Sequence, residues 1–341
     1  MDSLTQIVLG AAVSELAMGK KVGNKAILWG AICGTIPDLD VLLNPFLTDL
    51  QELSSHRGFS HSIVFSCLLA PILGFFLWRM YEKKEANWKE WTWACFLALV
   101  THPLLDCFTN YGTQLFLPFS NYRVAFNSIF IVDPCYTVPM LFCLIAALFL
   151  QRTKPARVLV NKIGMMVSHA YLLFTLLNKV YIDYVFENAL EHKYIGYYRY
   201  MTNPMPLQNL LWMCIAEDTT DFYLGYYSLL DKDKDIHFRK ISKNDARLEE
   251  LKKKFAIQRL YWFSNGYLAF TRKEGQLYAN DLRFGKTGTL FDDKGEFIYK
   301  WKILQENGNV EIKVEQPKFK WEKKAFEDLQ RRVKGEKRDS L

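Results

Sequence analysis

The sequence lacks the short motifs that mark several common classes of catalytic protein. It contains no Gly-x-Ser-x-Gly elbow, no P-loop and no Gly-x-Gly-x-x-Gly run, so nothing indicates a serine nucleophile or a nucleotide site. Its seven cysteines form no Cys-x-x-Cys pair and lie mostly in apolar stretches. This favours small core or lipid-facing residues over disulfides or a thiolate site. Any chemistry must therefore rest on other residue types.

Composition divides the chain into two parts. Half of the 341 residues are hydrophobic, 15% are aromatic, and the formal charge is +7. The first half is too apolar and the second too charged for one uniform globule, and the length allows two domains. We expect a mainly α, polytopic membrane domain over residues 1–194, followed by a small soluble α+β domain with a charged tail over residues 195–341.

Six apolar stretches are candidates for membrane helices. A span needs about 17 to 25 mostly apolar residues. The stretches that begin at Ile63 and Ile163 meet this length best, and the first two are marginal. In chain order the stretches are Leu4–Met18, Ala26–Leu43, Ile63–Tyr81, Trp91–Phe108, Tyr136–Leu150 and Ile163–Ile182.

Basic residues gather in alternate loops between these stretches. If six segments alternate, all three basic loops fall on one side, which the positive-inside rule makes cytoplasmic. The basic excess therefore indicates membrane orientation, and we expect no nucleic-acid partner. The loop residues are Lys20, Lys21 and Lys25; Arg79, Lys83, Lys84 and Lys89; and Arg152, Lys154, Arg157 and Lys162.

Three polar clusters lie beside apolar stretches, where polar groups are costly unless they have a function or a partner. The clusters are Pro37–Asp40, Ser54–Ser62 and His102–Asp106. Under the orientation above, all three fall on the non-cytoplasmic face. Because the loop charges and the cluster positions are independent observations, their agreement predicts a single site on that face.

The clusters offer residues that ligate metals. His102 and Asp106 are spaced i, i+4 and so share one helix face, where they either bind one divalent ion or form a hydrogen bond that fastens helices. Arg57 either binds a substrate phosphate through its planar fork or forms a salt bridge to a nearby carboxylate. The predicted metal ligands are Asp38, Asp40, His56, His61, His102 and Asp106.

The donor set limits the choice of metal. Mixed nitrogen and oxygen donors suit zinc or manganese, whereas magnesium or calcium would prefer oxygen alone. Six ligands are generous for one ion and reasonable for two that share a carboxylate. Two such ions could activate water and hold a phosphate during displacement. We therefore expect a divalent cofactor, zinc in the first place.

The same motifs, together with Met1–Gln6, resemble the YdjM family of inner-membrane, metal-dependent hydrolases over about residues 1–180. The family is in turn similar, more remotely, to zinc-dependent phospholipase C and single-strand nucleases, with His102 and Asp106 matching a His-x-x-x-Asp ligand pair. The resemblance implies phosphoester hydrolysis in a bacterial inner membrane. Gln6 departs from it, because many members carry histidine there, and the departure leaves the number of metals open.

The second half alternates strand and turn patterns. Asn203–Pro206 is typical of a linker, Ser264–Gly266 of a hairpin turn, Ser242–Phe255 of a charged helix, and Lys318–Leu341 of a solvated helix. The expected strands are Asn209–Ala216, Phe222–Leu230, Gln258–Phe263, Tyr267–Arg272, Gln276–Phe284, Glu296–Leu304 and Val310–Val314.

The favoured function is zinc-dependent hydrolysis of a phosphoester, in particular of a lipid, by a multi-pass membrane protein. Arg57, His61 and Asp106 are the predicted catalytic residues, with Arg57 on the phosphate. The alternative is a non-enzymatic membrane protein that carries a structural metal or a helix-locking polar site and recruits an unknown protein through its soluble domain. A transporter fits less well, because the charged residues lie at segment ends and not at the bilayer midplane.

Overall fold

The computed structural model describes residues 1–81, 85–244, 248–287, 295–306, 309–315 and 323–337, and it forms two compact units. The helical unit comprises Met1–Phe46, Ser54–Asn178 and Pro206–Gln208, and the sheet unit comprises Leu47–Leu53, Lys179–Met205 and Asn209–Leu341. The predicted fold class, a helical N-terminal region followed by an α+β domain, is confirmed. The predicted loop residues Lys83 and Lys84 lie outside the described residues.

Each of the six predicted apolar stretches coincides with helical structure. The second stretch is an α-helix that continues as a 3₁₀ helix, and the last is much longer than predicted and belongs partly to the sheet unit. The helical segments are α1 (Ser3–Val22), α2 (Asn24–Thr35), η1 (Ile36–Phe46), η2 (Phe59–His61), α4 (Ile63–Met80), α5 (Trp88–Asp106), α6 (Pro134–Leu148) and α7 (Pro155–His192).

Among the described residues, three helical segments are long and apolar enough to cross a membrane: Asn24–Phe46, Ile63–Met80 and Pro155–His192. The 18 residues of α4 extend about 27 Å at 1.5 Å per residue, close to the thickness of a bilayer core. Leu68, Ile72 and Phe76 on this helix are exposed. Such an apolar outer surface suits contact with lipid.

Close helix packing depends on glycine. A Cβ atom added at Gly30 of α2 would lie 2.3 Å from the carbonyl oxygen of Gly10 in α1, and one added at Gly34 would lie 2.5 Å from the carbonyl oxygen of Gln6. Gly30 and Gly34 form a Gly-x-x-x-Gly pair, which allows two helix backbones to approach closely. The same contact brings Gln6 near the end of α2.

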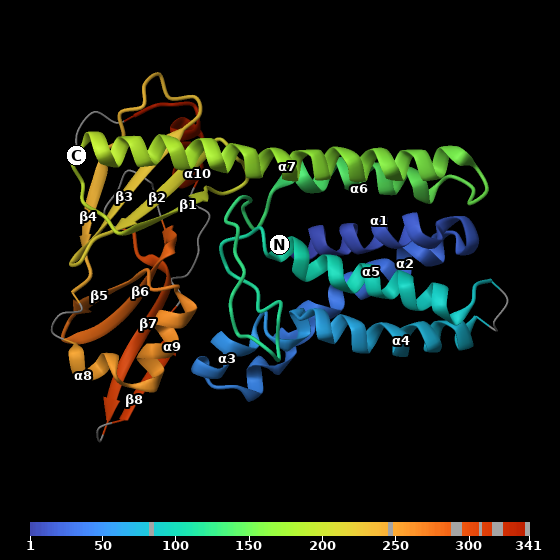
Figure 1. Ribbon diagram of the computed structural model, residues 1–341, viewed down its shortest axis with the longest axis horizontal. Coiled ribbons are helices and arrows are strands. Elements are labelled where there is room, and N and C mark those ends of the chain that lie inside the picture. Colours follow the sequence, from blue (N-terminus) through green and yellow to red (C-terminus); the bar gives the residue numbers. More distant parts are fainter. Residues whose placement is uncertain (82–84, 245–247, 288–294, 307–308, 316–322, 338–341) are drawn as a thin grey trace. The chain divides into compact units, whose positions relative to one another are not determined.

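The turns that join α1 to α2 and α6 to α7 lie at one end of the helical unit, together with the end of α4 and the start of α5 (Figure 1). Lys21 pairs with Glu90, Lys25 pairs with Glu85 at 2.7 Å, and Arg152 donates a hydrogen bond of 2.8 Å to the Lys21 carbonyl. The starts of α1, α4 and α6 and the end of α5 lie at the opposite end. The polar clusters predicted to form a site are at this second end.

The sheet unit contains two four-stranded antiparallel sheets, with strand orders β1-β2-β3-β4 and β5-β6-β7-β8. A core of buried residues from both sheets joins them, including Met213, Ile215, Phe222, Tyr267 and Leu282. The elements are α3 (Asp49–Ser55), β1 (Arg199–Pro204), β2 (Leu211–Glu217), β3 (Asp221–Ser228), β4 (Phe238–Ser242), α8 (Glu249–Lys252), α9 (Phe255–Phe263), β5 (Leu268–Lys273), β6 (Gln276–Lys286), β7 (Phe297–Glu306), β8 (Asn309–Val314) and α10 (Lys323–Val333).

Four local predictions in this unit are wrong. The expected strand Gln258–Phe263 is part of helix α9, and the expected linker Asn203–Pro206 begins with the last two residues of β1. Ser264–Gly266 joins α9 to β5 and is not a hairpin turn. Of the expected helix Ser242–Phe255, the described part contains only the short α8 and the first residue of α9.

The predicted charged tail forms a helix, α10, in its described part. Arg332 of this helix makes two contacts to the carboxylate of Asp231, at 2.5 and 2.8 Å, and Arg332 is buried. The helix is therefore anchored to the sheet unit, although the sequence predicts a solvated one. Residues 316–322 and 338–341 of the tail region lie outside the described residues.

Candidate metal centre

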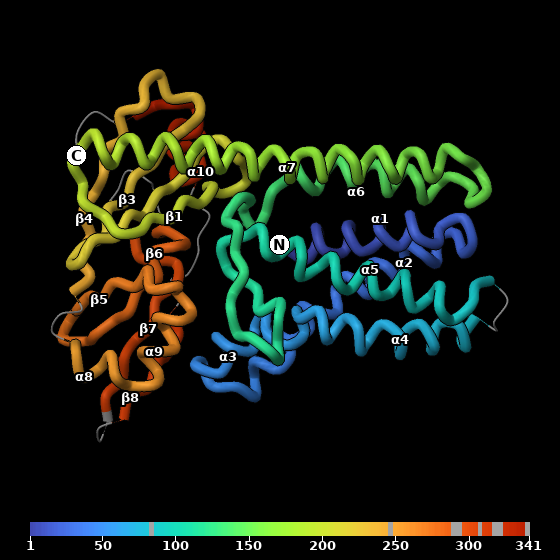
Figure 2. Tube along the Cα trace, viewed as in Figure 1, coloured from blue at the N-terminus to red at the C-terminus, as the bar shows by residue number. Residues whose placement is uncertain are grey.

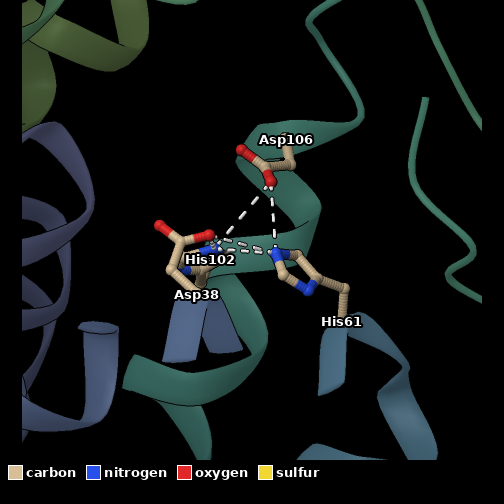
Figure 3. Close-up of side chains that lie close together, drawn as sticks. All are labelled: Asp38, His61, His102 and Asp106. Carbon is tan, nitrogen blue, oxygen red and sulfur yellow. Dashed lines mark hydrogen bonds and ion pairs between the residues drawn. The ribbon is translucent and has the colours of Figure 1, made fainter. Parts of the chain in front are cut away.

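Four side chains from three segments meet at one end of the helical unit. His102 and Asp106 lie in the last turn of α5, where their i, i+4 spacing places them on one face. Asp38 lies in η1, just after α2, and His61 is the last residue of η2. Figure 3 shows the four side chains pointing toward one another. They form a group that could hold a metal ion.

Five of the six distances between the four ligand atoms are close to the edges of a coordination tetrahedron, and all six are within 4.8 Å. The two Nε2 atoms of His61 and His102 are 3.2 Å apart, and Asp38 Oδ1 lies 3.4 and 3.3 Å from them. Asp106 Oδ2 lies 3.5 Å from His61 Nε2 and 3.8 Å from His102 Nε2. Metal–ligand bonds of about 2.0–2.1 Å in a tetrahedral zinc site place the ligand atoms about 3.3 Å apart.

The second ring nitrogen of each histidine is occupied. His102 Nδ1 lies 2.6 Å from the Gly34 carbonyl oxygen, which can only accept, so this nitrogen donates and Nε2 keeps its lone pair for a metal. His61 Nδ1 lies 3.0 Å from Ser60 Oγ. Burial lowers the pKa of His61 to about 4 against the opposing hydrogen bond to Asp38. At neutral pH its imidazole is therefore uncharged, which is the form that ligates a metal.

Asp106 is fully buried and divides its two oxygens between different roles. Oδ1 accepts a hydrogen bond of 3.0 Å from Gln6 Nε2 and contacts the Met1 amino group. Oδ2 faces the two imidazoles and forms an ion pair of 3.0 Å with Arg57 Nε, and no described residue donates a hydrogen bond to it. A carboxylate oxygen has lone pairs that this ion pair does not hydrogen-bond, and a metal ion could coordinate one of them. The group therefore fits a divalent cation.

The sequence comparisons identify the family. The model of the YdjM inner membrane protein family matches residues 1–182, more than half of the chain. The chain belongs to this family. All four residues of the group lie within the matched range.

Two curated relatives cover parts of this region. The uncharacterized protein YfhP of Bacillus subtilis is 32% identical over 141 residues, which are 39% of this chain and 42% of the relative. The inner membrane protein YbcI of Escherichia coli is 33% identical over 110 residues, which are 31% of this chain and 62% of the relative. The chain thus matches less than two thirds of either relative. No solved structure matches.

In this YdjM protein, two of the six predicted ligands lie outside the group of four. Asp40 accepts hydrogen bonds from the backbone N–H of Arg57 at 3.0 Å and from Ser60 Oγ at 3.2 Å. His56 Nδ1 lies 3.1 Å from Asp40 Oδ1. The assignment of Asp40 and His56 as ligands stays a prediction. In the structure they form an outer layer beside His61.

Arg57 lies against the group and is buried. Its Nε is 3.0 Å from Asp106 Oδ2, and its NH1 donates a hydrogen bond of 2.8 Å to Thr109 Oγ1. Its backbone φ of 55° is rare for a residue with a side chain, and the bond from its N–H to Asp40 holds it there. These contacts point the guanidinium at a ligand carboxylate. The predicted contact with a phosphate stays a prediction.

Sequence reasoning missed three supporting groups. The Gly34 carbonyl carries no side-chain signal, although the Gly-x-x-x-Gly pair in α2 indicates close packing there. Thr109 follows Asp106 by three residues at the end of a helix, a spacing that could have indicated its contact with the site. Ser60 lies within the predicted cluster Ser54–Ser62, but its residue type alone predicts no particular role. All three hold residues of the group or their neighbours by hydrogen bonds.

Proposed function

We propose that this YdjM protein is a membrane-bound hydrolase that uses one divalent ion, zinc, to cleave a phosphoester of a lipid. The observation that carries the proposal is the convergence of two imidazoles and two carboxylates on one point. Mixed nitrogen and oxygen donors of this kind suit zinc or manganese. An ion held there would polarise a phosphoester oxygen and promote ionisation of a water molecule.

Solvent reaches the group at one ligand. The side chain of Asp38 is 20% exposed, whereas those of His61, His102 and Asp106 are at most 1% exposed. A substrate would therefore approach beside Asp38. The guanidinium of Arg57, 3.0 Å from Asp106 Oδ2, keeps positive charge on the buried side. It would hold Asp106 in place and favour an anionic substrate.

The location of the group supports a lipid substrate and a defined orientation. The group lies at the helix ends opposite the described basic residues Lys21, Lys25 and Arg152. If the loops of these residues are cytoplasmic, as the positive-inside rule predicts, the group lies on the outer side of the inner membrane. His61 lies two residues before the first residue of the candidate span α4, which supports a site near the level of lipid head groups.

A second candidate function follows from the number of protein ligands. Four protein ligands complete a tetrahedron, as they do in structural zinc sites, whereas catalytic sites usually keep one position open. A structural ion would fasten η1, η2 and α5 to one another. This alternative predicts metal binding without hydrolysis.

The test offers zinc-loaded protein in detergent a nitrophenyl phosphodiester and a phospholipid, with and without a chelator. The proposal predicts hydrolysis that the chelator abolishes and that Asp38→Asn lowers by more than tenfold. Arg123→Lys, which changes a half-buried cation away from the four ligands, serves as the control and should retain activity. If neither ester is hydrolysed by fully loaded protein, or if the chelator has no effect, the structural alternative stands.

A further inference from the structure

The segment after α5 forms a narrow loop with an apolar tip. Thr113 and Val124 close it through two backbone hydrogen bonds of 3.0 and 2.9 Å. The eight residues between Leu115 and Tyr122 carry no charged side chain. Phe119 is 87% exposed and Tyr122 66% exposed. We call Leu115–Tyr122 the apolar tip.

The base of this loop is fixed to the start of a candidate membrane span. The N–H of Ile63, the first residue of α4, donates to the Leu115 carbonyl at 3.1 Å, and Gln114 Nε2 donates to the Ser54 carbonyl at 2.9 Å. Arg123 NH2 turns back to the carbonyl oxygens of Tyr111 and Gly112. Arg123 is the one charged residue in the described loop segment from Gly112 to Val124, and it is directed into the loop base.

The loop belongs to the same end of the helical unit as the candidate metal centre. Gln114 N–H donates to the Arg57 carbonyl at 3.1 Å, and Arg57 in turn contacts Asp106. Figure 2 shows that the segment after α5 lies at the end of the helical unit where both α1 and α4 begin. The depth of the tip relative to the bilayer is therefore determined by the position of Ile63, the first residue of α4.

We propose that the apolar tip inserts into the lipid bilayer at the boundary between head groups and acyl chains. Phe119 and Tyr122 are exposed aromatic side chains in a segment that contains no charged residue. Such side chains suit this boundary, where aromatic residues of membrane proteins are enriched. The tip is continuous, through Ile63, with the lipid-facing surface of α4. Leu42, Leu43 and Phe46 on η1 are also exposed apolar side chains, and they lie within a candidate span.

Insertion of the tip would place the candidate metal centre against the lipid layer, whether or not a reaction occurs there. The loop base holds the backbone at Arg57, and the tip would hold that base at the membrane surface. A phosphate in the head-group layer would then lie close to the exposed edge at Asp38. The inference about the tip does not depend on hydrolysis and survives if the ion is structural.

Photo-crosslinking tests whether lipid or protein contacts the apolar tip. A benzophenone-bearing phenylalanine replaces Phe119 in the full-length protein, and native inner-membrane vesicles are irradiated before mass spectrometry. Phe119 is 87% exposed, so a larger aromatic ring there should leave folding intact. Leu42, within a candidate span, is the positive control. Phe255 of α9, 70% exposed in the sheet unit, is the negative control.

The proposal predicts phospholipid adducts from position 119 at a yield close to that from position 42, and few from position 255. Adducts between position 119 and residues 195–341, or with a second copy of the chain, would show that protein covers the tip and would overturn the proposal. So would equal lipid yields at positions 119 and 255, because exposure alone would then explain them. The proposal would also be overturned if position 42 gave lipid adducts and position 119 gave none.

Discussion

At the scale of single residues, hydrogen bonds around the group of four orient its side chains and determine which of their atoms face one another. The Gly34 carbonyl fixes the proton of His102 on Nδ1, and Ser60 contacts the corresponding nitrogen of His61. Gln6 occupies Asp106 Oδ1 and leaves Oδ2 facing the imidazoles. Such contacts would orient these side chains for a metal ion. The group is thus organised by its neighbours.

Arg57 provides a prediction about this support. Its Nε lies 3.0 Å from Asp106 Oδ2, so Arg57→Lys should lower zinc affinity about tenfold or more, the usual effect of losing an outer contact to a ligand. Competition with a zinc-binding dye measures this affinity. Arg123→Lys, which alters contacts to the Tyr111 and Gly112 carbonyl oxygens and to the Tyr111 ring, is the matched control. Unchanged zinc affinity with slower turnover would instead favour the phosphate contact predicted from the sequence.

Asp221 in the sheet unit provides a prediction about pH. Burial alone would raise the pKa of this carboxyl, but Lys240 at 2.8 Å and hydrogen bonds from Thr220 and Ser242 lower it to about 2. Because the unfolded chain binds this proton more readily, the stability from Asp221 is complete above about pH 4 and is lost as pH falls toward 2.

Denaturant titrations of the full chain in detergent at several pH values measure the effect. The free energy of unfolding of the wild-type sheet unit should exceed that of Asp221→Asn at pH 6, and the difference should shrink between about pH 4 and pH 2. A difference that stays constant over this range would show that Asp221 does not account for the acid sensitivity.

Residue chemistry identified the three clusters but could not choose between neighbours. Asp38 and Asp40 have the same side chain two positions apart, and only the 3₁₀ path of η1 shows that Asp38 joins the group of four. The same holds for His56 and His61, since the sequence does not show that Gly58 and the short η2 separate their directions. These choices depend on tertiary packing.

At the scale of elements, the helix pair α1–α2 links packing to the site. Gly10, Gly30 and Gly34 allow close contact between the two backbones, and the carbonyl oxygen of Gly34 also lies 2.6 Å from His102 Nδ1 of α5. In the sheet unit, the sequence predicted β2, β3 and β5–β8 from their strand patterns but mistook α9 for a strand. Its aromatic residues suit strands, yet its buried residues Ala256, Ile257, Leu260 and Phe263 follow helical spacing.

Gly30→Ala tests the helix contact. The added Cβ would lie 2.3 Å from the Gly10 carbonyl oxygen and 2.5 Å from Ser14 Cβ, which should outweigh the better helix propensity of alanine. We expect a loss of about 1–3 kcal/mol in the free energy of unfolding. Thermal unfolding in detergent measures it. Gly196→Ala, whose Cβ would meet nothing within 4 Å, is the control, and equal stability of the two variants would contradict the packing account.

At the scale of the whole molecule, hydropathy and loop charge predicted most of the helical unit. The six apolar stretches became helices because length and apolarity determine them locally, and the basic loops cluster because alternate turns meet at one end. The length of α7 was not predicted. Its charged second half, Lys179–His192, reads as soluble and belongs to the sheet unit.

Labelling in intact cells tests the orientation. Single cysteines at exposed positions, Lys154→Cys in a basic loop and Lys253→Cys in the sheet unit, are treated with a membrane-impermeant maleimide, and the labelling of the parent chain is subtracted. The positive-inside rule predicts labelling at 253 and none at 154 until the membrane is opened. Labelling at 154 in intact cells would reverse the orientation.

The central claim is that Asp38, His61, His102 and Asp106 together hold one divalent ion, and the zinc content of purified protein tests it most directly. The wild-type protein should carry about one zinc ion per chain. His61→Ala, His102→Ala and Asp106→Ala should each lose it while remaining in the membrane. His56→Ala, which changes a histidine outside the group, should keep it. Wild-type zinc content in all four variants would contradict the claim, and so would loss in His56→Ala equal to that in His102→Ala.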